Sequence, residues 1–405
     1  MKSTCCSSWI CKSASRLALA GLFLVFTGLL GAAQTFTTLH QFTDKSDGGL
    51  PSDLILDGNG NIYGGTWQGG NMNCSSGQGC GTIFKIDASN EFSVIYAFDG
   101  SPDAAFAGGP LVLDSAGNLY GTTGFGGTAN LGTVFKVDAD GNDVVLYNFK
   151  GGTDGQNGSS GLVRDGAGNL YGTTPNGGDL ACYIQRQLQC GIVFKVSKAG
   201  KETVLHRFNG HDGAFPYAGL IRDGQGNLYG TTGGGINFAG SVFRIDKTGE
   251  FTVLHRFSAA GDGYEPHGRL LRDAGGNLYG TTDSGGKNNF GTVYKIESGG
   301  KETVLYSFKG GPDGGEPYGN LVRDKADNLY GTTMLGGDLA CNHGSGCGTI
   351  FELDKTGHEM VLHNFEGTPG KFPQAGLVID SAGNLYGTTK GDALTNFGSV
   401  FKLIP

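Results

Sequence analysis

The sequence has few charged residues and no helical pattern. Charged residues account for 16% of the 405 residues, against ~25% in an average soluble domain. Beyond residue 33, no stretch keeps apolar residues at helical spacing over three turns. Gly, in contrast, contributes 77 residues, and aromatic residues make up 10%. This balance indicates many short strands joined by tight turns, with little room for surface helices.

Local catalytic motifs are also absent. The sequence has no Gly-x-Ser-x-Gly elbow, no His-Glu-x-x-His pair, no phosphate-binding loop and no dinucleotide fingerprint. Enzymes of the corresponding classes are therefore not indicated. An enzyme whose site is assembled from distant parts of the chain would leave no such motif and stays compatible with the sequence.

Residues 1–33 have the pattern of a signal peptide. Three basic residues precede an apolar run from Leu17 to Leu30, and small residues at positions 31–33 offer a cleavage point. The run through Ala33 has 17 residues, at the lower limit for spanning a membrane, so an uncleaved anchor is the alternative. No second apolar run follows. The mature chain is expected to be secreted, extracellular or periplasmic, without a membrane span.

Removal of the signal leaves an acidic chain. The first 33 residues hold three of the 29 Lys and Arg and none of the 37 Asp and Glu, so the mature charge is −11. Polyanions bind to basic surfaces, and a nucleic-acid partner is therefore not expected. The acidity says nothing about neutral sugars or peptides.

Seven copies of one phrase divide the rest of the chain. The phrase is Asn-Leu-Tyr-Gly-Thr-Thr or a close variant, and its tyrosines are spaced by 57, 51, 58, 50, 51 and 56 residues. Such self-similarity is the signature of a repeat fold. The tyrosines are Tyr63, Tyr120, Tyr171, Tyr229, Tyr279, Tyr330 and Tyr386.

Each unit is predicted to form four antiparallel strands, A to D. In the third unit these are 161–165, 169–174, 191–197 and 202–208, rich in Val, Leu, Ile, Tyr, Phe and Thr and separated by Gly, Asn and Asp. Several strands are apolar on both faces, as in blades that pack against each other around a ring.

The two ends of the chain complement each other. The first D-type strand, Thr37 to Phe42, precedes the first A strand, and the chain stops after a C-type strand, Gly398 to Leu403. Pairing of these strands would complete the last unit. The sequence thus predicts an all-β fold, in which residues 34–405 form one seven-bladed β-propeller closed by its N-terminal strand. A superhelical β-solenoid is the alternative.

Three phrases resemble a known bacterial family. Gly-Asn-Leu-Tyr-Gly-Thr-Thr, Gly-Thr-Val-Phe-Lys and Thr-Val-Leu-Tyr-Ser-Phe are similar to the GloVer tandem repeat of exported "choice-of-anchor" proteins. The Asp-x-x-Gly-Asn turn is more distantly similar to NHL-repeat and streptogramin lyase propellers. The GloVer resemblance covers essentially the whole mature chain. It implies a propeller and export, and it implies no activity for any residue.

Six of the nine cysteines form three local pairs, each between strands B and C of a longer unit. The second cysteine of each pair directly precedes the Gly that opens strand C, where shorter units have an apolar residue. In an exported chain these pairs predict disulfides, each worth ~2 kcal/mol. They lie in separate units without paired histidines, so zinc is not expected. The pairs are Cys74 with Cys80, Cys182 with Cys190, and Cys341 with Cys347.

Ligand-binding candidates lie at one end of the predicted ring. In four-stranded blades the B–C loops and D–A crossings emerge on one face, here the loop face, and the A–B and C–D turns on the other, here the turn face. Only the loop face varies between units, as expected where loops carry function. Its aromatic and polar side chains suit sugar or peptide binding, or they fill gaps between blades. They are Trp67, Tyr183, Arg186, His211, Phe215, Tyr217, Tyr264, His267 and Tyr318.

Aspartates recur at two fixed places. One set precedes the A–B turns and is expected to accept turn N–H groups. The second set recurs in the D–A crossings, where a turn role is preferred to calcium. No cofactor is expected, and calcium is the open alternative, with 138–143 as the nearest look-alike of a calcium loop. The turn set is Asp57, Asp114, Asp165, Asp223, Asp273, Asp324 and Asp380; the crossing set is Asp47, Asp103, Asp154, Asp212, Asp262 and Asp313.

Basic residues show two further patterns. Four arginines at the end of strand A could line the central channel and hold an anionic group, although pairing with nearby carboxylates such as Glu265 or Glu316 is preferred. Four histidines share one strand D position on separate blades, so they are expected to pack and not to form one metal site. The arginines are Arg164, Arg222, Arg272 and Arg323; the histidines are His40, His206, His255 and His363.

These observations favour an exported, monomeric binding scaffold whose loop face engages a carbohydrate, peptide or cell-surface partner. One alternative is a polysaccharide hydrolase or lyase that draws its acid and base from loop-face carboxylates and from His211 or His267. A structural component of the cell envelope is another.

Overall fold

The computed structural model describes residues 34–405 except 159, 185–186, 237–238, 259–260 and 393–395. The expected signal, 1–33, lies outside the described residues, and so does Arg186. Within the described part of the chain, no helix is both long and apolar enough to cross a membrane. Helical structure there is limited to three short 3-10 turns, Ser75–Gly77, Gly152–Asp154 and Asn342–Gly344.

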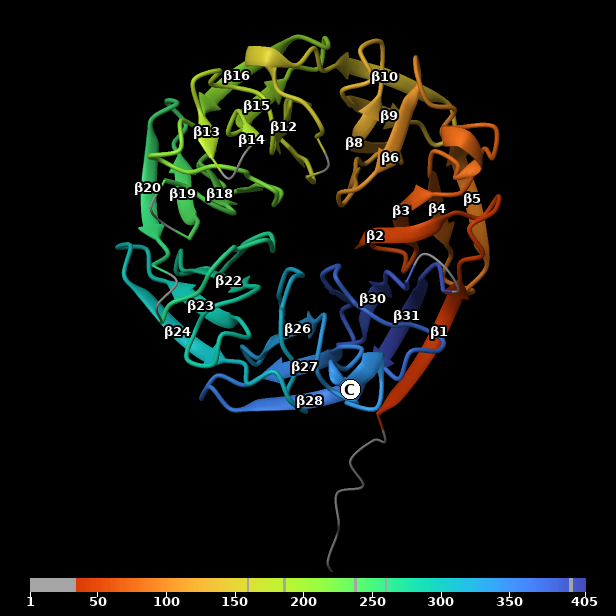
Figure 1. Cartoon of the computed structure of the whole chain (residues 1–405). Helices are drawn as coiled ribbons and strands as arrows, with labels where there is room; N and C mark the ends of the chain where they lie inside the picture. Colours follow the sequence, from red (N-terminus) through yellow and green to blue (C-terminus); the bar gives the residue numbers. More distant parts are fainter. Residues whose placement is uncertain (1–33, 159, 185–186, 237–238, 259–260, 393–395) are drawn as a thin grey trace, which may run out of the picture. The chain divides into compact units, whose positions relative to one another are not determined.

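Residues 34–405 form seven antiparallel blades in a ring, which confirms the predicted seven-bladed propeller (Figure 1). From the axis outwards, the strands of blades one to seven are β2 (Gly49–Leu56), β3 (Ile62–Gln68), β4 (Thr82–Ile86) and β5 (Phe92–Ala97); β7 (Val112–Leu113), β8 (Leu119–Gly126), β9 (Thr133–Val137) and β10 (Asp143–Asn148); β11 (Val163–Arg164), β12 (Leu170–Thr174), β15 (Ile192–Val196) and β16 (Glu202–Arg207); β17 (Ile221–Arg222), β18 (Leu228–Thr232), β19 (Ser241–Ile245) and β20 (Phe251–Arg256); β21 (Leu271–Arg272), β22 (Leu278–Thr282), β23 (Thr292–Ile296) and β24 (Glu302–Ser307); β25 (Val322–Arg323), β26 (Leu329–Thr333), β27 (Thr349–Leu353) and β28 (Glu359–Asn364); and β29 (Val378–Ile379), β30 (Leu385–Thr389), β31 (Ser399–Ile404) and β1 (Thr35–Gln41).

The N-terminal strand closes the ring as predicted. Strand β1 pairs antiparallel with β31, from Thr35 opposite Ile404 to Gln41 opposite Ser399, with a bulge after Thr38. In Figure 1 β1, in red, lies along the outer side of β31, in blue. The first and last strands of the ring therefore share one sheet, and blade seven has the same four strands as the other blades.

The innermost strands are shorter than predicted. In the third blade the expected strand A of 161–165 is reduced to the two residues of β11. The residues before it crowd around the axis instead: a Cβ on Gly161 would lie 2.4 Å from Pro110 of the preceding blade. Backbone packed this closely to a neighbouring blade leaves the ladder of its own sheet. Two short additions were not expected, β6 (Ala104–Ala107) beside β8 and the hairpin β13 (Tyr183–Ile184) and β14 (Gln187–Leu188).

The recurring Tyr-Gly-Thr-Thr phrase has a packing reason. At Gly172, a Cβ would lie 2.7 Å from Phe194 of strand C and 2.8 Å from Leu162, so the aromatic ring covers the glycine. The following Thr173 donates from Oγ1 to the carbonyl of Ala218 in the next blade, at 3.0 Å. Each phrase thus supplies both a space inside its own blade and a bond to the neighbouring one.

The turn aspartates bind their own turns, as expected. Asp223 accepts hydrogen bonds from the backbone N–H of Gln225 and Asn227, from the Asn227 amide and from the Tyr229 hydroxyl. Partial burial alone would raise the pKa of Asp223, but these hydrogen bonds outweigh it and the pKa is lowered. In all seven units the Asp binds both the Asn and the Tyr of its turn, so the turn face has the same construction throughout.

The crossing aspartates also have a structural role. The strand D residue that precedes each crossing donates to its carboxylate, for example Tyr96 to Asp103 at 3.0 Å and His206 to Asp212 at 2.9 Å. The same carboxylates accept a backbone N–H within the crossing, such as that of Asp99 on Asp103. These contacts confirm the turn role that was preferred to calcium.

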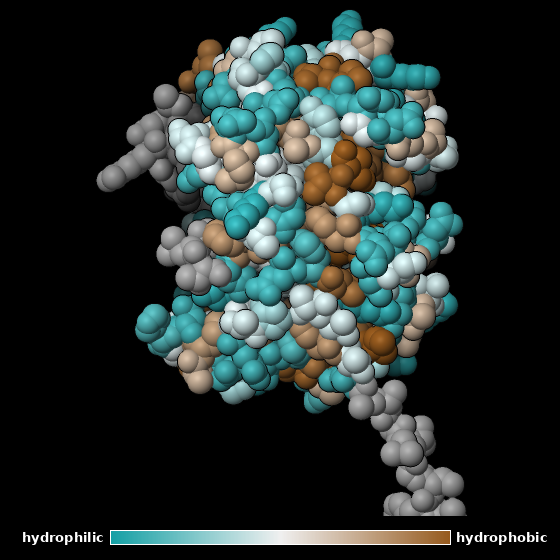
Figure 2. Space-filling model, turned by 90° about the vertical axis from the view of Figure 1, so that its right-hand side faces the viewer, coloured by the Kyte–Doolittle hydropathy of each residue, from teal (hydrophilic) through white to brown (hydrophobic). Residues whose placement is uncertain are grey.

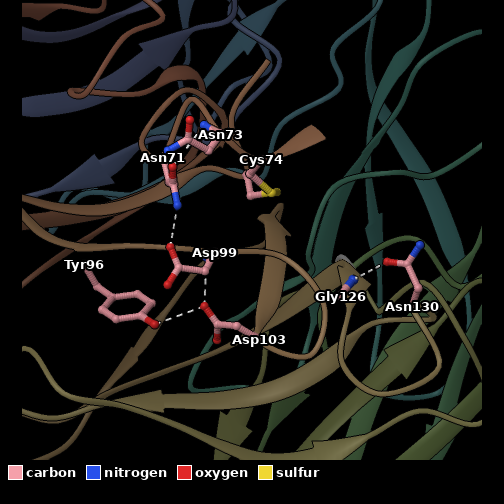
Figure 3. Close-up of a disulfide and its surroundings, with 9 residues drawn as sticks. Asn71, Asn73, Cys74, Tyr96, Asp99, Asp103, Gly126 and Asn130 are labelled. Atoms are coloured by element: carbon pink, nitrogen blue, oxygen red, sulfur yellow. Dashed lines mark hydrogen bonds between the residues drawn. A yellow bond between two sulfur atoms is a disulfide. The ribbon is translucent and has the colours of Figure 1, made fainter. Parts of the chain in front are cut away.

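The three predicted disulfides are formed, Cys74 with Cys80, Cys182 with Cys190 and Cys341 with Cys347. Figure 3 shows Cys74 beside Asn71, whose amide donates to Asp99 at 2.6 Å. The carbonyl of Cys80 accepts the N–H of Phe106 in the next blade at 2.8 Å. Residues at the place of the second cysteine make the same contact in units without a disulfide, as Phe290 does with Glu316 at 2.9 Å. Each disulfide therefore anchors the contact between two blades.

The outer wall is largely hydrophilic. Figure 2 shows one side of the ring, where hydrophobic residues appear in small separate groups among polar ones. The large apolar side chains face the blade interfaces, where the strand C and strand D phenylalanines, such as Phe208 and Phe243, are fully buried. Scattered apolar residues of this kind are normal for a protein surface and indicate no docking site.

Candidate functional site

A cavity of about 380 Å³ lies around the ring axis on the loop face. All seven blades contribute to its lining through the residues that enter strand A, and two of them also through residues after strand B. Its volume falls in the ~300–1,000 Å³ range of small-molecule sites. Because strand A is short, the chain before it bends inwards and forms the floor of this cavity.

The floor is a ring of seven equivalent positions, which we call the neck ring. Each member directly precedes the recurring Leu of strand A, such as Leu270. Four members are Gly or Pro, and only three carry a polar side chain. The neck ring consists of Asp53, Pro110, Gly161, Gly219, Arg269, Asn320 and Gly376.

A second set of equivalent positions, the rim ring, follows the Thr-Thr of strand B. Strand B ends here on the loop face, and the backbone N–H commonly binds the crossing of the same blade, as Lys390 binds the carbonyl of Phe372 at 3.1 Å. Trp67 and Lys390 of this ring line the cavity. The rim ring consists of Trp67, Gly124, Pro175, Gly233, Asp283, Met334 and Lys390.

Two opposite charges of the neck ring face each other without contact. Asp53 accepts the backbone N–H of Gly376 at 2.6 Å. Burial raises the pKa of Asp53, although this hydrogen bond and the charge of Arg269 oppose the rise. Burial likewise lowers the pKa of Arg269 against the attraction of Asp53. Arg269 lines both the loop-face cavity and the channel below it, so its guanidinium lies at the narrow part of the axis.

Aromatic side chains form one wall. His267 stacks on Tyr318 with ring centroids 4.4 Å apart and packs on Tyr217 at 5.2 Å. Trp67 lies elsewhere on the lining and stacks on Phe106 at 5.4 Å. Rings held in place by stacking can offer flat faces to a ligand at low entropic cost.

Next to this wall lies a group of potential metal ligands. The ligand atoms of Glu265, His267 and Asp283 all lie within 4.8 Å of one another, and Nε2 of His267 is 3.7 Å from each carboxylate. Burial raises the pKa of Asp283 to about 6, while the nearby His267 and the Ser284 hydroxyl oppose the rise. Imidazole and carboxylate groups are ligands of divalent cations such as Zn²⁺. These three residues could hold such an ion or exchange a proton.

The structure brings together four of the predicted ligand-binding residues. Trp67, Tyr217, His267 and Tyr318 line the cavity. Phe215 is 2% exposed in the core, where its positive φ of 58° serves the crossing.

The remaining candidates lie apart from this group. Tyr264 forms a bridge with Ser284 and is not part of the lining. His211 is exposed on a crossing, away from the lining residues. The backbone of Tyr183 belongs to β13, and its side chain lies outside the described part, as Arg186 does.

The predicted arginine arc lies on the turn-face side of the channel. Arg164, Arg222 and Arg272 line the channel openings there. The expected carboxylate partners, Glu265 and Glu316, are wrong, because the arginines reach the preceding blade at the turn face. Arg164 lies 3.8 Å from Asp114 and 5.5 Å from the ring centre of Tyr120. Likewise, Arg323 lies 3.7 Å from Asp273, Arg323 lies 2.8 Å from Asp327 and Arg272 packs on Tyr229.

Sequence reasoning missed Arg269, Asp53 and Lys390. Each differs from its six counterparts in the other units, and this difference is visible when the seven copies are placed in register on the recurring Leu and Thr-Thr. Arg269 escaped notice because it precedes strand A and Arg272 ends it, and only the latter belongs to a repeated pattern.

The fold and the axial cavity define the class of this protein, a seven-bladed β-propeller with a recess on its loop face. A family model described as the Gloeobacter/Verrucomicrobia repeat matches residues 25–184 and 181–401. The chain therefore belongs to this repeat family, as the GloVer resemblance implied. A comparison with curated protein sequences finds no match.

Solved structures with the same architecture include enzymes and a receptor domain. A catalytically inactive variant of virginiamycin B lyase from Staphylococcus aureus, determined with quinupristin, is 13% identical, with a TM-score of 0.59 over 92% of this chain and 99% of that chain. A puromycin hydrolase mutant is 12% identical, with a TM-score of 0.58 over 87% of this chain and 53% of that chain. The extracellular domain of a putative one component system from B. thetaiotaomicron is 11% identical, with a TM-score of 0.56 over 91% of this chain and 40% of that chain. At these identities the likeness shows the fold alone.

Proposed function

We propose that this protein is an exported binding protein that takes a small ligand, a carbohydrate in the first place, in the loop-face cavity. The observation that carries the proposal is the position of the sequence differences between repeats. The turn aspartates are the same in every unit, whereas the neck ring and the rim ring differ from unit to unit and border one cavity. Structural needs alone would favour the same residue at equivalent positions of a ring.

The lining suits a sugar. Trp67, Tyr217 and Tyr318 offer aromatic faces, and Asn320, Gln374 and Ser52 offer hydrogen-bonding groups at the same cavity. Aromatic faces combined with a few polar groups are typical of sites that bind amphipathic ligands. Export is supported by the disulfides, which persist in oxidising compartments.

The test is a glycan and peptide binding screen on the purified protein, scored by thermal shift and confirmed by calorimetry. A ligand that binds the native state raises the melting temperature. Substitution Trp67→Ala is expected to weaken binding at least 10-fold, because it removes an aromatic face of the lining. His211→Ala is the control on the same face but outside the cavity, and its affinity should stay within twofold of the wild type. Equal losses in both variants would place the ligand elsewhere.

A catalytic role is the second candidate, favoured by one observation. Glu265, His267 and Asp283 bring two carboxylates and an imidazole together, and His267 also lines the cavity. A carboxyl with a pKa near neutrality beside an imidazole can serve as an acid or base. For this candidate, turnover of a bound glycan should be lost in Asp283→Asn while binding of the same glycan persists.

A further inference from the structure

Arg269 is the one arginine among the seven neck positions, and its guanidinium has unused bonding capacity. Across the described residues, the structure contains no hydrogen bond and no ion pair to this group. The nearest opposite charge, Asp53, attracts it but is already bound to the Gly376 N–H. A guanidinium has five N–H donors, and withdrawing them from water without a partner is unfavourable.

The balance of charge in the cavity contrasts with that of the protein. The chain as a whole carries a net charge of −8. The charged side chains that line the cavity are two cations, Arg269 and Lys390, and one carboxylate, Asp53. Burial lowers the pKa of Lys390, and the described residues place no ion-pair partner on its ammonium group. An otherwise acidic protein thus has a recess that favours an anion.

The surroundings restrict the anion to a compact one. The cavity is bordered by all seven blades and has the neck ring as its floor, so a ligand enters end-on. Extended peptides are commonly bound along an open strand edge or in a long groove. The inner edge strands offer little of either, since those of blades two to seven contain two residues each.

We propose, as an extension of the proposed binding function, that the cavity recognises a sugar acid, with the sugar carboxylate at Arg269 and the ring between Trp67 and the wall of Tyr217 and Tyr318. The planar guanidinium can bind a carboxylate through two parallel hydrogen bonds, which fixes its orientation as well as its charge. Lys390 supplies a second positive charge from the rim.

Ligand analogues test this without changing the protein. Glucuronate, glucuronamide and glucose share a pyranose ring and differ in the group at one carbon. Calorimetry should give an affinity for glucuronate, or for galacturonate or mannuronate, that is 10- to 100-fold above those of the amide and of glucose, since bonds to a charged group are worth ~1.5–3 kcal/mol. The preference should decline with rising salt concentration. Equal affinities for the acid and the amide would overturn the proposal.

Protein variants locate the carboxylate. Arg269→Met should remove the preference for the acid and leave glucose affinity unchanged, and Arg269→Lys should keep part of it because the charge remains. Arg272→Met is the matched control, since Arg272 lies on the same strand but on the channel side and packs on Tyr229. Unaltered glucuronate binding by Arg269→Met would contradict the proposal, and Lys390→Met gives a second measurement should the first variant not fold.

The outcomes separate this inference from the broader proposal. If neutral sugars bind in the cavity as tightly as sugar acids, the sugar-acid inference is wrong and the binding function stands. Should a peptide carboxylate bind and sugar acids not, the sugar-acid inference is again wrong. If Trp67→Ala alters the binding of no ligand in the screen, both proposals are wrong.

Discussion

The two ends of the ring are built from the same seven repeats but differ in what they keep constant. At the turn face, an Asp in every unit binds the Asn and the Tyr of its own turn. At the loop face, the neck ring places Asp53, Pro110 and Arg269 at equivalent positions. The comparison teaches that the turn face carries the stability of the repeat, whereas the loop face is free to vary around a cavity.

The strongest way to break this comparison is to remove one turn aspartate. Asp223→Ala deletes four hydrogen bonds and leaves the turn N–H groups of Gln225 and Asn227 without their acceptor. Bonds to a carboxylate are the stronger kind, so the free energy of unfolding should fall by about 2–3 kcal/mol. Urea denaturation measures the change.

The matched variant lies on the opposite face. Lys390→Met in the rim ring should alter the free energy of unfolding by less than about 0.5 kcal/mol, as is usual for a substitution that breaks no structural contact. A loss as large as that of Asp223→Ala would show that the loop face is not free to vary.

The disulfides sharpen the comparison, because they belong to the variable face. Replacing Cys182 and Cys190 by Ala opens a loop with a sequence separation of 8 and should cost about 2 kcal/mol. Hydrogen exchange should rise in the B–C loop of blade three and at Phe215, whose N–H bonds to the Cys190 carbonyl. Exchange at the turn around Asp165 should stay unchanged. Uniformly faster exchange in the whole blade would mean that the two faces are not independent.

The smallest expected effect concerns the outer interfaces between blades. Burial, together with a neighbouring crossing Asp, raises the pKa of Asp143, Glu202, Glu302 and Glu359 to about 7. The folded protein then holds more protons than the unfolded chain between about pH 4 and 7, so these groups make it less stable as the pH rises through that window. His363, whose pKa burial lowers to about 4, acts in the opposite direction.

A variant isolates this effect from the histidine. Glu302→Gln removes the carboxyl next to Asp262, so its stability relative to the wild type should improve more at pH 8 than at pH 5. The turn aspartates, whose pKa values are lowered, lose their contribution only below about pH 4 and do not interfere. Identical stability differences at both pH values would contradict this assignment.

The architecture was predictable because its signals repeat. Tyr171 and its counterparts located strand B, and the unmatched end strands at Thr37 and Gly398 revealed how the ring closes. The length of strand A was overestimated, since the sequence does not show that Gly161 packs against the neighbouring Pro110. Pattern alone cannot report contacts between blades at the axis.

The candidate site was predictable only in part. Trp67 and His267 were chosen as aromatic or polar residues in variable loops, and both line the cavity. Phe215 was chosen for the same reason but turns into the core. Arg269 lies beside a strand that looks like all the others, and its significance depends on its distance from the axis, which no local pattern encodes.

The pairing of β1 with β31 has a consequence for the order of assembly. Residues 35–41 are synthesised early, yet their partners, 399–404, come last. Six sheets can form from strands close together in sequence, whereas the seventh requires the whole chain. The slowest contact to form is then this one seam, because pairing of distant segments limits folding rates. The ring can lock only after the complete polypeptide has become available.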